Sequence, residues 1–560
     1  MILPHINEIA SLCAAHGIKQ AIVSPGSRSA AISLAFENHP EIDVKVVADE
    51  RSAAFIGMGI ALQKQEAVAL ICTSGSAAFN YAPAIAEAYY QEIPLLVITA
   101  DRPPEWVNQY DGQTIQQEDI YGKHVKAAFN LPVDLSHSDA QWHANRLVNE
   151  AILATRSFPK GPVHLNVPLR EPFYPGEDDK FEYPKVRKIE SLEAEKTLSE
   201  ANWNELLGLW KSFSNRLIVV GQSNPDTELS QALADLAQKT GTPIINEITA
   251  NQHGIENVIT KQDVFLQGQP KLEAPELLIT LGNSLISKNL KEFLRKNPTK
   301  AHWHIRQGSR LNDSLRQVTH VIDQKPAQFI QTLTTLVSES DTSAFGEAWS
   351  SLGREVEKKA QDFLHQATFG EFKAVQTCLN QLPTQGQLHL ANSMSVRYAN
   401  FIGLRQNEVS VYCNRGTSGI DGSNSTAVGA ALSTDDMVTL ITGDMAFLYD
   451  RNAFWHPYDL NNLRIIVMNN AGGGIFGMIK GPRSLASYEK LFQTNQPITA
   501  KLTAKEFGFE YATAKNDDQL NDELKSFFNP SSSAKILEVF SDPKVNEKVL
   551  ADFKAYCLGL

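Results

Sequence analysis

The stretches "ITGDMAFLYD" (441–450) and "RIIVMNNAGGGIF" (464–476) each join an apolar, strand-like run to a polar break. The first run breaks at Asp444 and the second at Asn470. The interval between them fits one strand–helix–strand crossover of a parallel sheet, which would bring the two strand ends side by side. A carboxylate, an amide oxygen and a nearby backbone carbonyl suit a hard divalent cation such as Mg²⁺. The bare backbone of "NNAGGG" can approach a diphosphate closely.

Similar apolar runs, separated by helix-like stretches, recur along the 560-residue chain. This alternation is typical of parallel sheets that are covered on both faces. We therefore expect an α/β protein of three Rossmann-like, doubly wound parallel-sheet domains, formed by residues 1–180, 190–345 and 355–560. The charged, proline-containing stretch 171–200 is predicted to be a linker, and the polar stretch 335–385 is predicted to be helical.

The strands are expected at short runs rich in Val and Ile. In the first domain these are "QAIVSPG", "VKVVADE", "AVALICTSG", "PLLVITADR" and "GPVHLNVP". In the second they are "RLIVVGQSN", "PIINEI", "ELLITLGN" and "AHWHIRQ", and in the third "SVYCNRG", "MVTLITGD", "LRIIVMNN" and "AKILEVFSD". At the N-terminus, Ile6, Ile9 and Cys13 recur at helical spacing and predict an amphipathic helix.

The composition argues against several classes of protein. The hydrophobic fraction of 42% is ordinary for a soluble globular protein, and the net charge of −12 argues against nucleic-acid or anionic-membrane partners. The five cysteines form no CxxC pair, which is typical of reduced residues in a cytosolic protein. The N-terminus does not resemble a signal peptide, and no apolar run approaches the ~20 residues of a membrane span. We expect a soluble, cytoplasmic protein.

Glu50 ends the run "VKVVADE" and is followed by an apolar, helix-like stretch. A carboxylate buried at such a point is costly unless it is paired or protonated. A helix cap or a salt-bridged residue is the ordinary interpretation, and a carboxylate that serves a bound cofactor is the alternative.

Cationic residues follow or adjoin several of the strand-like runs. Arginine offers a planar fork that can bind a carboxylate through two hydrogen bonds. Each of these cations alone fits a structural or surface charge, but together, in an acidic chain, they indicate a substrate that carries more than one carboxylate. They are Arg28, Arg102, Lys288, Arg397 and Arg415.

Longer motifs run through the first and third expected domains: "SPGSRSA", "DERSAAFIGMGIA", "TSGSAAFNYAPA", "TADRPPE", "GQTIQQ", "NRGTSGIDGSNSTAVG" and "GDMAFLYD…NNAGGGIF". Together they resemble the 2-succinyl-5-enolpyruvyl-6-hydroxy-3-cyclohexene-1-carboxylate (SEPHCHC) synthases, thiamine-diphosphate (ThDP) enzymes of menaquinone biosynthesis. In the central domain the resemblance rests mainly on "LGNSLISKNL". It implies a pyrimidine-binding first domain and a diphosphate-binding third domain.

The resemblance also implies a role for each motif position in binding the cofactor. Glu50 matches the glutamate that activates ThDP. Asp444 and Asn470 match the metal ligands, with the carbonyl of Gly472 as a third ligand, and Ile420 matches the bulky residue that keeps the cofactor bent. The full implied cofactor set is Glu50, Ser393, Gly419, Ile420, Gly443, Asp444, Met445, Ala446, Asn470, Gly472, Ile475 and Phe476.

A second implied set binds the substrates: Ser27, Arg28, Arg102, Gln113, Lys288, Asn289, Arg397, Arg415, Ile475 and Phe476. The implied catalytic residues are Glu50, Arg28, Gln113, Arg397 and Arg415. Two positions depart from common patterns. Met445 stands where many ThDP enzymes have glycine, and Asn289 stands where some relatives carry a second cation.

The activity implied is a decarboxylation of 2-oxoglutarate and a 1,4-addition to isochorismate, dependent on ThDP and Mg²⁺ or Mn²⁺. The resemblance further implies a homodimer or homotetramer with the cofactor at the subunit interface. Two alternatives stay open. One is another ThDP carboligase or decarboxylase of the acetolactate synthase type, which would use pyruvate. The other is a non-catalytic nucleotide-binding or scaffolding protein built from Rossmann-like units.

Overall fold

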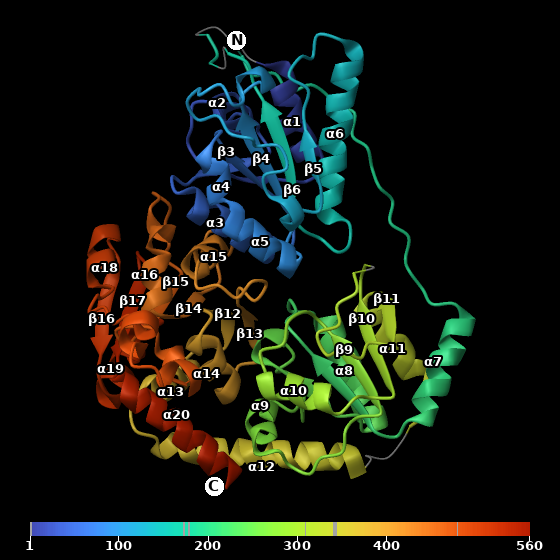
Figure 1. Cartoon of the computed structure of the whole chain (residues 1–560), viewed down its shortest axis with the longest axis vertical. Coiled ribbons are helices and arrows are strands. Elements are labelled where there is room, and N and C mark those ends of the chain that lie inside the picture. Colours follow the sequence, from blue (N-terminus) through green and yellow to red (C-terminus); the bar gives the residue numbers. More distant parts are fainter. Residues whose placement is uncertain are drawn as a thin grey trace. The chain divides into compact units, whose positions relative to one another are not determined.

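The computed structural model describes residues 3–171, 174–176, 180–308, 310–339, 344–478 and 480–559. Three sheets of six, five and six strands lie along the chain (Figure 1). The strand pairs are parallel, and helices separate and flank the strands. The predicted α/β fold with three parallel sheets is confirmed, whereas the boundaries of the three domains stay predictions.

The first sheet has the strand order β2-β1-β3-β4-β6-β5. Its strands are β1 (Gln20–Val23), β2 (Asp43–Val46), β3 (Val68–Cys72), β4 (Leu95–Asp101), β5 (Ala128–Asn130) and β6 (Val163–Pro168). Its helices are α1 (Pro4–Ala15), α2 (Ala30–Glu37), α3 (Glu50–Lys64), α4 (Ser76–Asn80), α5 (Ala82–Gln91) and α6 (Ser138–Arg156). As predicted, α1 buries Ile6, Ile9 and Cys13.

The second sheet has the order β11-β10-β9-β7-β8. Its strands are β7 (Arg216–Val220), β8 (Ile244–Asn246), β9 (Leu277–Leu281), β10 (Ala301–Arg306) and β11 (His320–Asp323). The helices of this region are α7 (Glu200–Ser212), α8 (Thr227–Thr240), α9 (Gln262–Phe265), α10 (Lys288–Lys296) and α11 (Pro326–Leu336). The long helix α12 (Ala344–Gln366) and α13 (Glu371–Asn380) then confirm the predicted helical stretch.

The third sheet has the order β13-β12-β14-β15-β17-β16. Its strands are β12 (Gln385–Leu390), β13 (Glu408–Tyr412), β14 (Val438–Gly443), β15 (Leu463–Asn469), β16 (Glu510–Ala514) and β17 (Lys535–Phe540). The helices of this part of the chain are α14 (Met394–Ile402), α15 (Ser423–Ala431), α16 (Asp444–Tyr449), α17 (Lys480–Arg483), α18 (Lys501–Phe507), α19 (Asp517–Phe527) and α20 (Pro543–Leu558).

Four strands were not expected from the sequence: β5, β11, β12 and β16. β12 is an interior strand, but Gln385, Gln387 and His389 interrupt its apolar residues. The other three, β5, β11 and β16, each lie at the edge of their sheet. Most of their residues are only partly buried or exposed, so they lack the apolar runs that mark interior strands.

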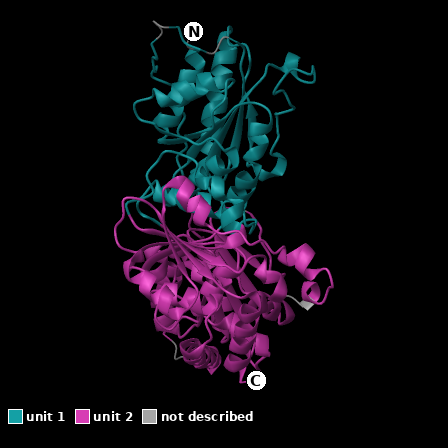
Figure 2. Cartoon of the chain, turned by 90° about the vertical axis from the view of Figure 1, so that its left-hand side faces the viewer, with its two compact units in different colours: residues 1–193, 414–435, 446–463 teal, residues 194–413, 436–445, 464–560 magenta. Residues whose placement is uncertain are grey.

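The chain divides into two compact units (Figure 2). Unit 1 comprises residues 1–193, 414–435 and 446–463, and unit 2 comprises residues 194–413, 436–445 and 464–560. The first sheet belongs to unit 1, and the second and third sheets belong to unit 2. Helix α15 follows β13 in the chain but belongs to unit 1.

Each unit has its own hydrophobic core. In unit 1 the core includes α1, α6 and the strands of the first sheet. In unit 2 one cluster contains residues of both the second and third sheets, together with the fully buried Trp349 of α12. All five cysteines are buried free thiols, which agrees with the absence of paired motifs in the sequence. None of the helices in the described part of the chain has the length and apolar character needed to cross a membrane.

Helices α3 and α15 pack closely within unit 1 because each presents a glycine to the other. A Cβ atom on Gly59 would lie 2.2 Å from the carbonyl oxygen of Thr426. A Cβ atom on Gly429 would lie 2.1 Å from the carbonyl oxygen of Ile56. Both distances are shorter than any van der Waals contact, so the two backbones meet only where side chains are missing. This crossing joins the helix that begins at Glu50 to the helix that follows the "NRGTSGIDG" loop.

We expect Gly59→Ala to lower the free energy of unfolding by about 1–3 kcal/mol, because the added methyl group forces α3 and α15 apart. The midpoint of urea unfolding, followed by circular dichroism, measures the change. Gly208→Ala is the matched control: it lies inside α7, and its Cβ would meet no atom within 4 Å. Higher helix propensity should make the control neutral or more stable by about 0.5–1 kcal/mol. Equal midpoints for the two variants would contradict the close crossing.

Candidate active site

The residues predicted for the site fall into two groups, one in each compact unit, and each group is described by itself. In unit 2, Asp444 directly follows β14 and Asn470 directly follows β15. These strands are neighbours in the third sheet, so the two strand ends lie side by side, as the spacing predicts. Asp444 is 5% exposed and Asn470 is 7% exposed.

Burial dominates the electrostatics of Asp444. It raises the pKa of this carboxyl to about 7, against the opposing effect of hydrogen bonds from the backbone amides of Met445, Gly472 and Ala471. The Met445 amide donates to Asp444 Oδ1 at 2.7 Å. The carboxylate therefore lies within hydrogen-bonding reach of the loop that follows Asn470.

A second buried carboxylate lies beside this pair and was not predicted from the sequence. Glu371 is the first residue of α13 and is 4% exposed. Its Oε1 accepts a hydrogen bond from Asn470 Nδ2 at 2.6 Å. Burial, followed by the charge of Asp444, raises the pKa of Glu371 to about 7. An acidic residue in the first turn of a helix is common, so the sequence gives little reason to single it out.

Among the described residues, Asp444 and Glu371 form no ion pair with a lysine, arginine or histidine. Buried charges in proteins are normally paired or coordinate a metal. The carbonyl of Gly472 accepts one hydrogen bond, from the Gly474 amide at 3.0 Å, and keeps a second lone pair. This set of carboxylate, amide and carbonyl oxygens fits a hard divalent cation.

The backbone after Asn470 is packed too tightly to accept side chains. A Cβ atom on Gly472 would lie 2.4 Å from the carbonyl oxygen of Gln493. The next amide, of Gly473, donates to that same oxygen at 2.7 Å. Ala471 precedes this contact with a left-handed φ of 63°. The glycine run therefore serves a close approach between two backbone segments within unit 2.

Three further cofactor candidates surround Asp444 in the chain. Gly443 has open space where a Cβ would lie, Met445 is half-buried, and Ala446 is buried. The backbone amide of Met445 is engaged by Asp444 Oδ1, and we expect its side chain to point away from the cofactor.

Ser393 and Arg397 lie close together in unit 2. Ser393 precedes α14 with a left-handed φ of 76°, which is unusual for a residue other than glycine. Arg397 Nη1 donates to the backbone carbonyl of Ser393. This contact ties the arginine to the strained turn at the start of the helix.

Lys288 and Asn289 are the first two residues of α10, and their side chains differ in exposure and in hydrogen-bond partners. The Lys288 side chain is 82% exposed and lies 3.6 Å from the carboxylate of Glu292. Asn289 Nδ2 donates to the carbonyl oxygen of Asp263 at 2.6 Å, and its backbone amide donates to the Asp263 carboxylate. The Asn289 amide is thus already used to fix α10 against α9.

The apolar candidates follow the glycine run. Ile475 is half-buried and packs against the core cluster of unit 2. The ring of Phe476 lies 5.7 Å from that of Phe492, centre to centre.

In unit 1, Glu50 is the first residue of α3 and is half-buried. Its Oε2 accepts a hydrogen bond from Asn80 Nδ2 at 3.3 Å. The helix cap is the preceding residue, Asp49, whose side chain accepts from the Ser52 amide at 3.2 Å. Glu50 is therefore neither the cap nor part of an ion pair among the described residues, which removes the ordinary interpretation of its position.

Arg28 and Arg102 lie near one another in unit 1. Burial, and then the charge of Arg102, lower the pKa of Arg28. Arg28 Nη1 donates to the Leu169 carbonyl at 3.0 Å, and Arg102 Nε lies 3.2 Å from the Asp111 carboxylate. Arg28 also lies 3.6 Å from the carboxylate of Glu171, so both arginines already face carboxylates of the chain, and a carboxylate ligand would take the place of such a partner.

The other two candidates of this group are more exposed. The exposed Ser27 hydroxyl lies 2.9 Å from the Tyr174 hydroxyl. Gln113 is exposed and has a left-handed φ of 56°. The backbone of Gln113 lies against Gly75, where an added Cβ would come within 3.3 Å of it.

The loop that carries Arg415, Gly419 and Ile420 belongs to unit 1 and is held by Glu87, a residue that was not predicted. Glu87 lies in α5 and is 1% exposed. Its carboxylate accepts hydrogen bonds from the amides of Gly416 and Thr417, both at 2.6 Å, and from the Thr417 hydroxyl at 2.5 Å. Arg415, Gly419 and Ile420 are half-buried.

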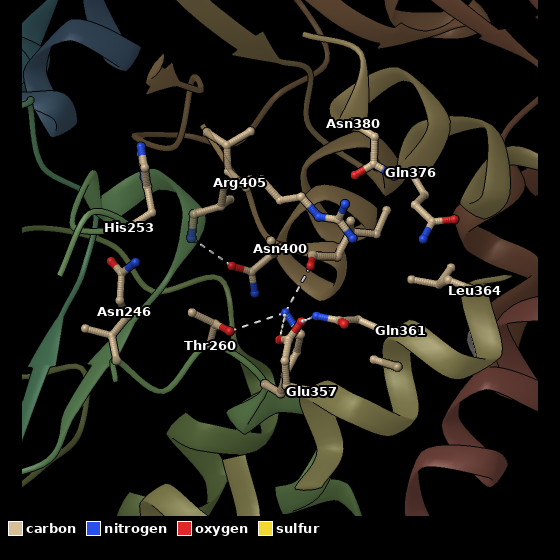
Figure 3. A pocket seen from close by; sticks show the side chains of 17 residues that line it. Asn246, His253, Thr260, Glu357, Gln361, Leu364, Gln376, Asn380, Asn400 and Arg405 are labelled. Atoms are coloured by element: carbon tan, nitrogen blue, oxygen red, sulfur yellow. Dashed lines mark hydrogen bonds and ion pairs between the residues drawn. The ribbon is translucent and has the colours of Figure 1, made fainter. Parts of the chain in front are cut away.

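Unit 2 also contains a cavity of about 190 Å³ (Figure 3). Lys261, 2% exposed, lies in its wall and pairs with Glu357 at 2.8 Å while donating to the Ile402 carbonyl. Lys261 therefore contacts both α12, through Glu357, and the end of α14, through Ile402. None of the residues predicted for the site lines the cavity.

Comparison with known proteins gives the class of the chain. Three family profiles match it in order: "Thiamine pyrophosphate enzyme, N-terminal TPP binding domain" at residues 7–122, "Middle domain of thiamine pyrophosphate" at 188–390, and "Thiamine pyrophosphate enzyme, C-terminal TPP binding domain" at 393–539. The chain is a ThDP-dependent enzyme, and the prediction of thiamine diphosphate as cofactor is confirmed.

Curated relatives narrow this class to one family. The chain is 44% identical to a protein of Cytophaga hutchinsonii and 38% identical to one of Flavobacterium psychrophilum, each over 98% of both chains. It is 36% identical to a protein of Porphyromonas gingivalis over 97% of this chain and 95% of that protein. All three are named 2-succinyl-5-enolpyruvyl-6-hydroxy-3-cyclohexene-1-carboxylate synthase. The chain belongs to the SEPHCHC synthase family and is a transferase-type carboligase.

We expect Glu87→Ala to loosen the loop around Arg415, because two backbone amides lose a buried acceptor, at a cost of about 1–3 kcal/mol each. Local opening should then raise the rate of tryptic cleavage after Arg415 on the order of tenfold or more. Mass spectrometry of the fragments locates the cut. Glu41→Ala is the control, since the Glu41 side chain is 61% exposed. An unchanged cleavage rate in Glu87→Ala would contradict the anchoring role.

Proposed function

We propose that the chain catalyses decarboxylation of 2-oxoglutarate and 1,4-addition of the resulting four-carbon unit to isochorismate, which yields the SEPHCHC product of menaquinone biosynthesis. The observation that carries this proposal is the near-full-length similarity to synthases that bear this product's name. The two neighbouring arginines of unit 1 support it, because both substrates carry two carboxylates.

The second element of the proposal is a Mg²⁺ site, for which Mn²⁺ could substitute. Asp444 Oδ, Asn470 Oδ1 and the Gly472 carbonyl would hold the metal, and the buried, cation-free carboxylates support this assignment. When bound, ThDP supplies a nucleophilic thiazolium carbon and stores the electron pair that decarboxylation releases. Glu50 would hydrogen-bond the aminopyrimidine ring and hold a proton at that point.

The remaining residues would orient the substrates and exclude water. Arg28, Arg102, Gln113 and Arg415 in unit 1, and Lys288 and Arg397 in unit 2, would bind carboxylates and hydroxyls. Ser27 would add a hydroxyl. Asn289 would contribute less, since its amide is occupied by Asp263. Ile475 and Phe476 would form an apolar wall beside the reacting carbon, with Gly419, Ile420 and Ser393 against the cofactor.

We also propose that the protein works in the cytoplasm as a homodimer or homotetramer with the cofactor at the subunit interface. Large apolar side chains exposed on unit 1 support an assembly, because solvent-exposed aromatic groups are enriched at protein interfaces. They include Phe79, Tyr90, Tyr449 and Trp455, each at least 50% exposed.

The test is an assay of the purified protein with 2-oxoglutarate, isochorismate, ThDP and Mg²⁺. We expect the absorbance of isochorismate to fall, with CO₂ released in equal amount. Pyruvate in place of 2-oxoglutarate should give no turnover, because its methyl group offers nothing to the second carboxylate site. Turnover with pyruvate alone would overturn the proposal in favour of an acetolactate synthase type of reaction.

We expect Glu50→Gln to keep ThDP binding within a few-fold and to lower kcat by about 10²–10⁴-fold, the usual contribution of one positioned proton-transfer group. Calorimetry measures ThDP binding, and the isochorismate assay measures kcat. Glu8→Gln, another glutamate of unit 1 at the start of the chain, serves as the control and should leave both unchanged. Full activity of Glu50→Gln would refute the role of Glu50.

A further inference from the structure

We propose that Glu371 is a positioning residue for the metal site: it turns the amide of Asn470 so that the oxygen, Oδ1, faces the cation. This inference rests on the Mg²⁺ site of the proposed function. None of the motifs that mark the family contains Glu371, which stands in "TFGEFKA", before the third sheet begins.

The contact is direct and buried. Glu371 Oε1 accepts from Asn470 Nδ2 at 2.6 Å, between residues that are 4% and 7% exposed. An amide side chain donates only through its nitrogen and accepts only through its oxygen. Once a carboxylate holds the nitrogen, the oxygen points to the other side, where the Gly472 amide donates to it at 3.1 Å. Glu371 therefore determines which of the two atoms is presented to the Gly472 loop.

Glu371 is itself fixed in place. Its backbone amide, at the start of α13, donates to Asn546 Oδ1 at 2.9 Å, and Asn546 is 2% exposed and belongs to α20. The preceding Gly370 has fully extended backbone angles and lies against Asn546, where an added Cβ would come within 2.8 Å of Oδ1. The carboxylate thus reaches Asn470 from a backbone position held by a second helix.

The position requires an acceptor oxygen that holds the Asn470 nitrogen. Outer groups that orient metal ligands typically change metal affinity by 10–100-fold when they are removed.

The test compares variants by the Mg²⁺ concentration that supports ThDP binding, measured by calorimetry without substrate. Glu371→Leu removes the acceptor, and we expect it to raise this concentration by 10–100-fold. Glu371→Gln keeps an acceptor oxygen at the same place, and we expect it to restore affinity to within a few-fold of the wild type. Electron paramagnetic resonance of bound Mn²⁺ gives a second readout that does not depend on turnover.

Glu247→Leu is the matched control. Glu247 is also a fully buried glutamate of unit 2, but it accepts from the amides of Ile286 and Ser287, in the second sheet's region. We expect it to lower thermal stability and to leave the Mg²⁺ requirement of the folded protein unchanged. An equal loss of Mg²⁺ affinity in Glu247→Leu and Glu371→Leu would overturn the positioning role.

Asp444→Ala separates this inference from the proposed function. If Asp444→Ala abolishes Mg²⁺-dependent ThDP binding while Glu371→Leu binds as the wild type does, the role of Glu371 is refuted and the metal site stands. If Asp444→Ala binds Mg²⁺ and ThDP normally, the metal site itself is refuted. If Glu371→Gln needs as much Mg²⁺ for ThDP binding as Glu371→Leu does, the acceptor oxygen for Asn470 is not what Glu371 supplies, and the inference fails.

Discussion

Two buried carboxyl groups without a cationic partner, at the end of β14 and beside the end of β15, are the constraint on which this part of the structure depends. Asp444 and Glu371 are almost wholly removed from water, and no described cationic side chain pairs with them. Keeping both groups ionised is costly unless a positive ion enters the site. The glycine run after Asn470, the left-handed Ala471 and the fixed start of α13 would form the frame of the proposed cation site, because each of them limits how the oxygen atoms can move.

The sequence predicted part of this frame and could not predict the rest. Asp444 and Asn470 could be predicted from the sequence, because their spacing along the chain fits one crossover between neighbouring parallel strands. Glu371 could not, because its contact with Asn470 joins residues 99 positions apart and follows from no periodicity. The same holds for Glu87, whose contact with Gly416 spans 329 positions. Glu371 begins α13 and Glu87 lies within α5, and neither helix is unusual in sequence. Only the folded structure shows which residues the two carboxylates contact.

The fold was predictable where strands form continuous apolar runs; the strands that were missed are β5, β11 and β16 at the sheet edges and the interior strand β12, in which Gln385, Gln387 and His389 interrupt the apolar residues. Interior strands such as β3, β4 and β15 are buried along their whole length, so their sequences are continuous apolar runs. The edge strands β5, β11 and β16 are half in contact with water and carry no such signal. The contact between Gly59 of α3 and Gly429 of α15 could not be predicted either, because a small residue in a helix does not show which other helix packs against it.

Backbone strain is compatible with the implied site but does not by itself locate it, because positive φ angles also occur at other positions, such as Gln65 and Glu92 at the ends of α3 and α5. Gln113, Ser393 and Ala471 hold left-handed φ angles without being glycine, and each lies at or next to a position that the family resemblance implies for the site. Such conformations cost about 1–3 kcal/mol each and persist where the surrounding structure imposes them. Met445 belongs to the same argument. Its amide, not its side chain, engages Asp444. A position that contributes through its backbone amide accepts a residue larger than glycine if its φ is not left-handed. Met445 has no left-handed φ and meets this condition.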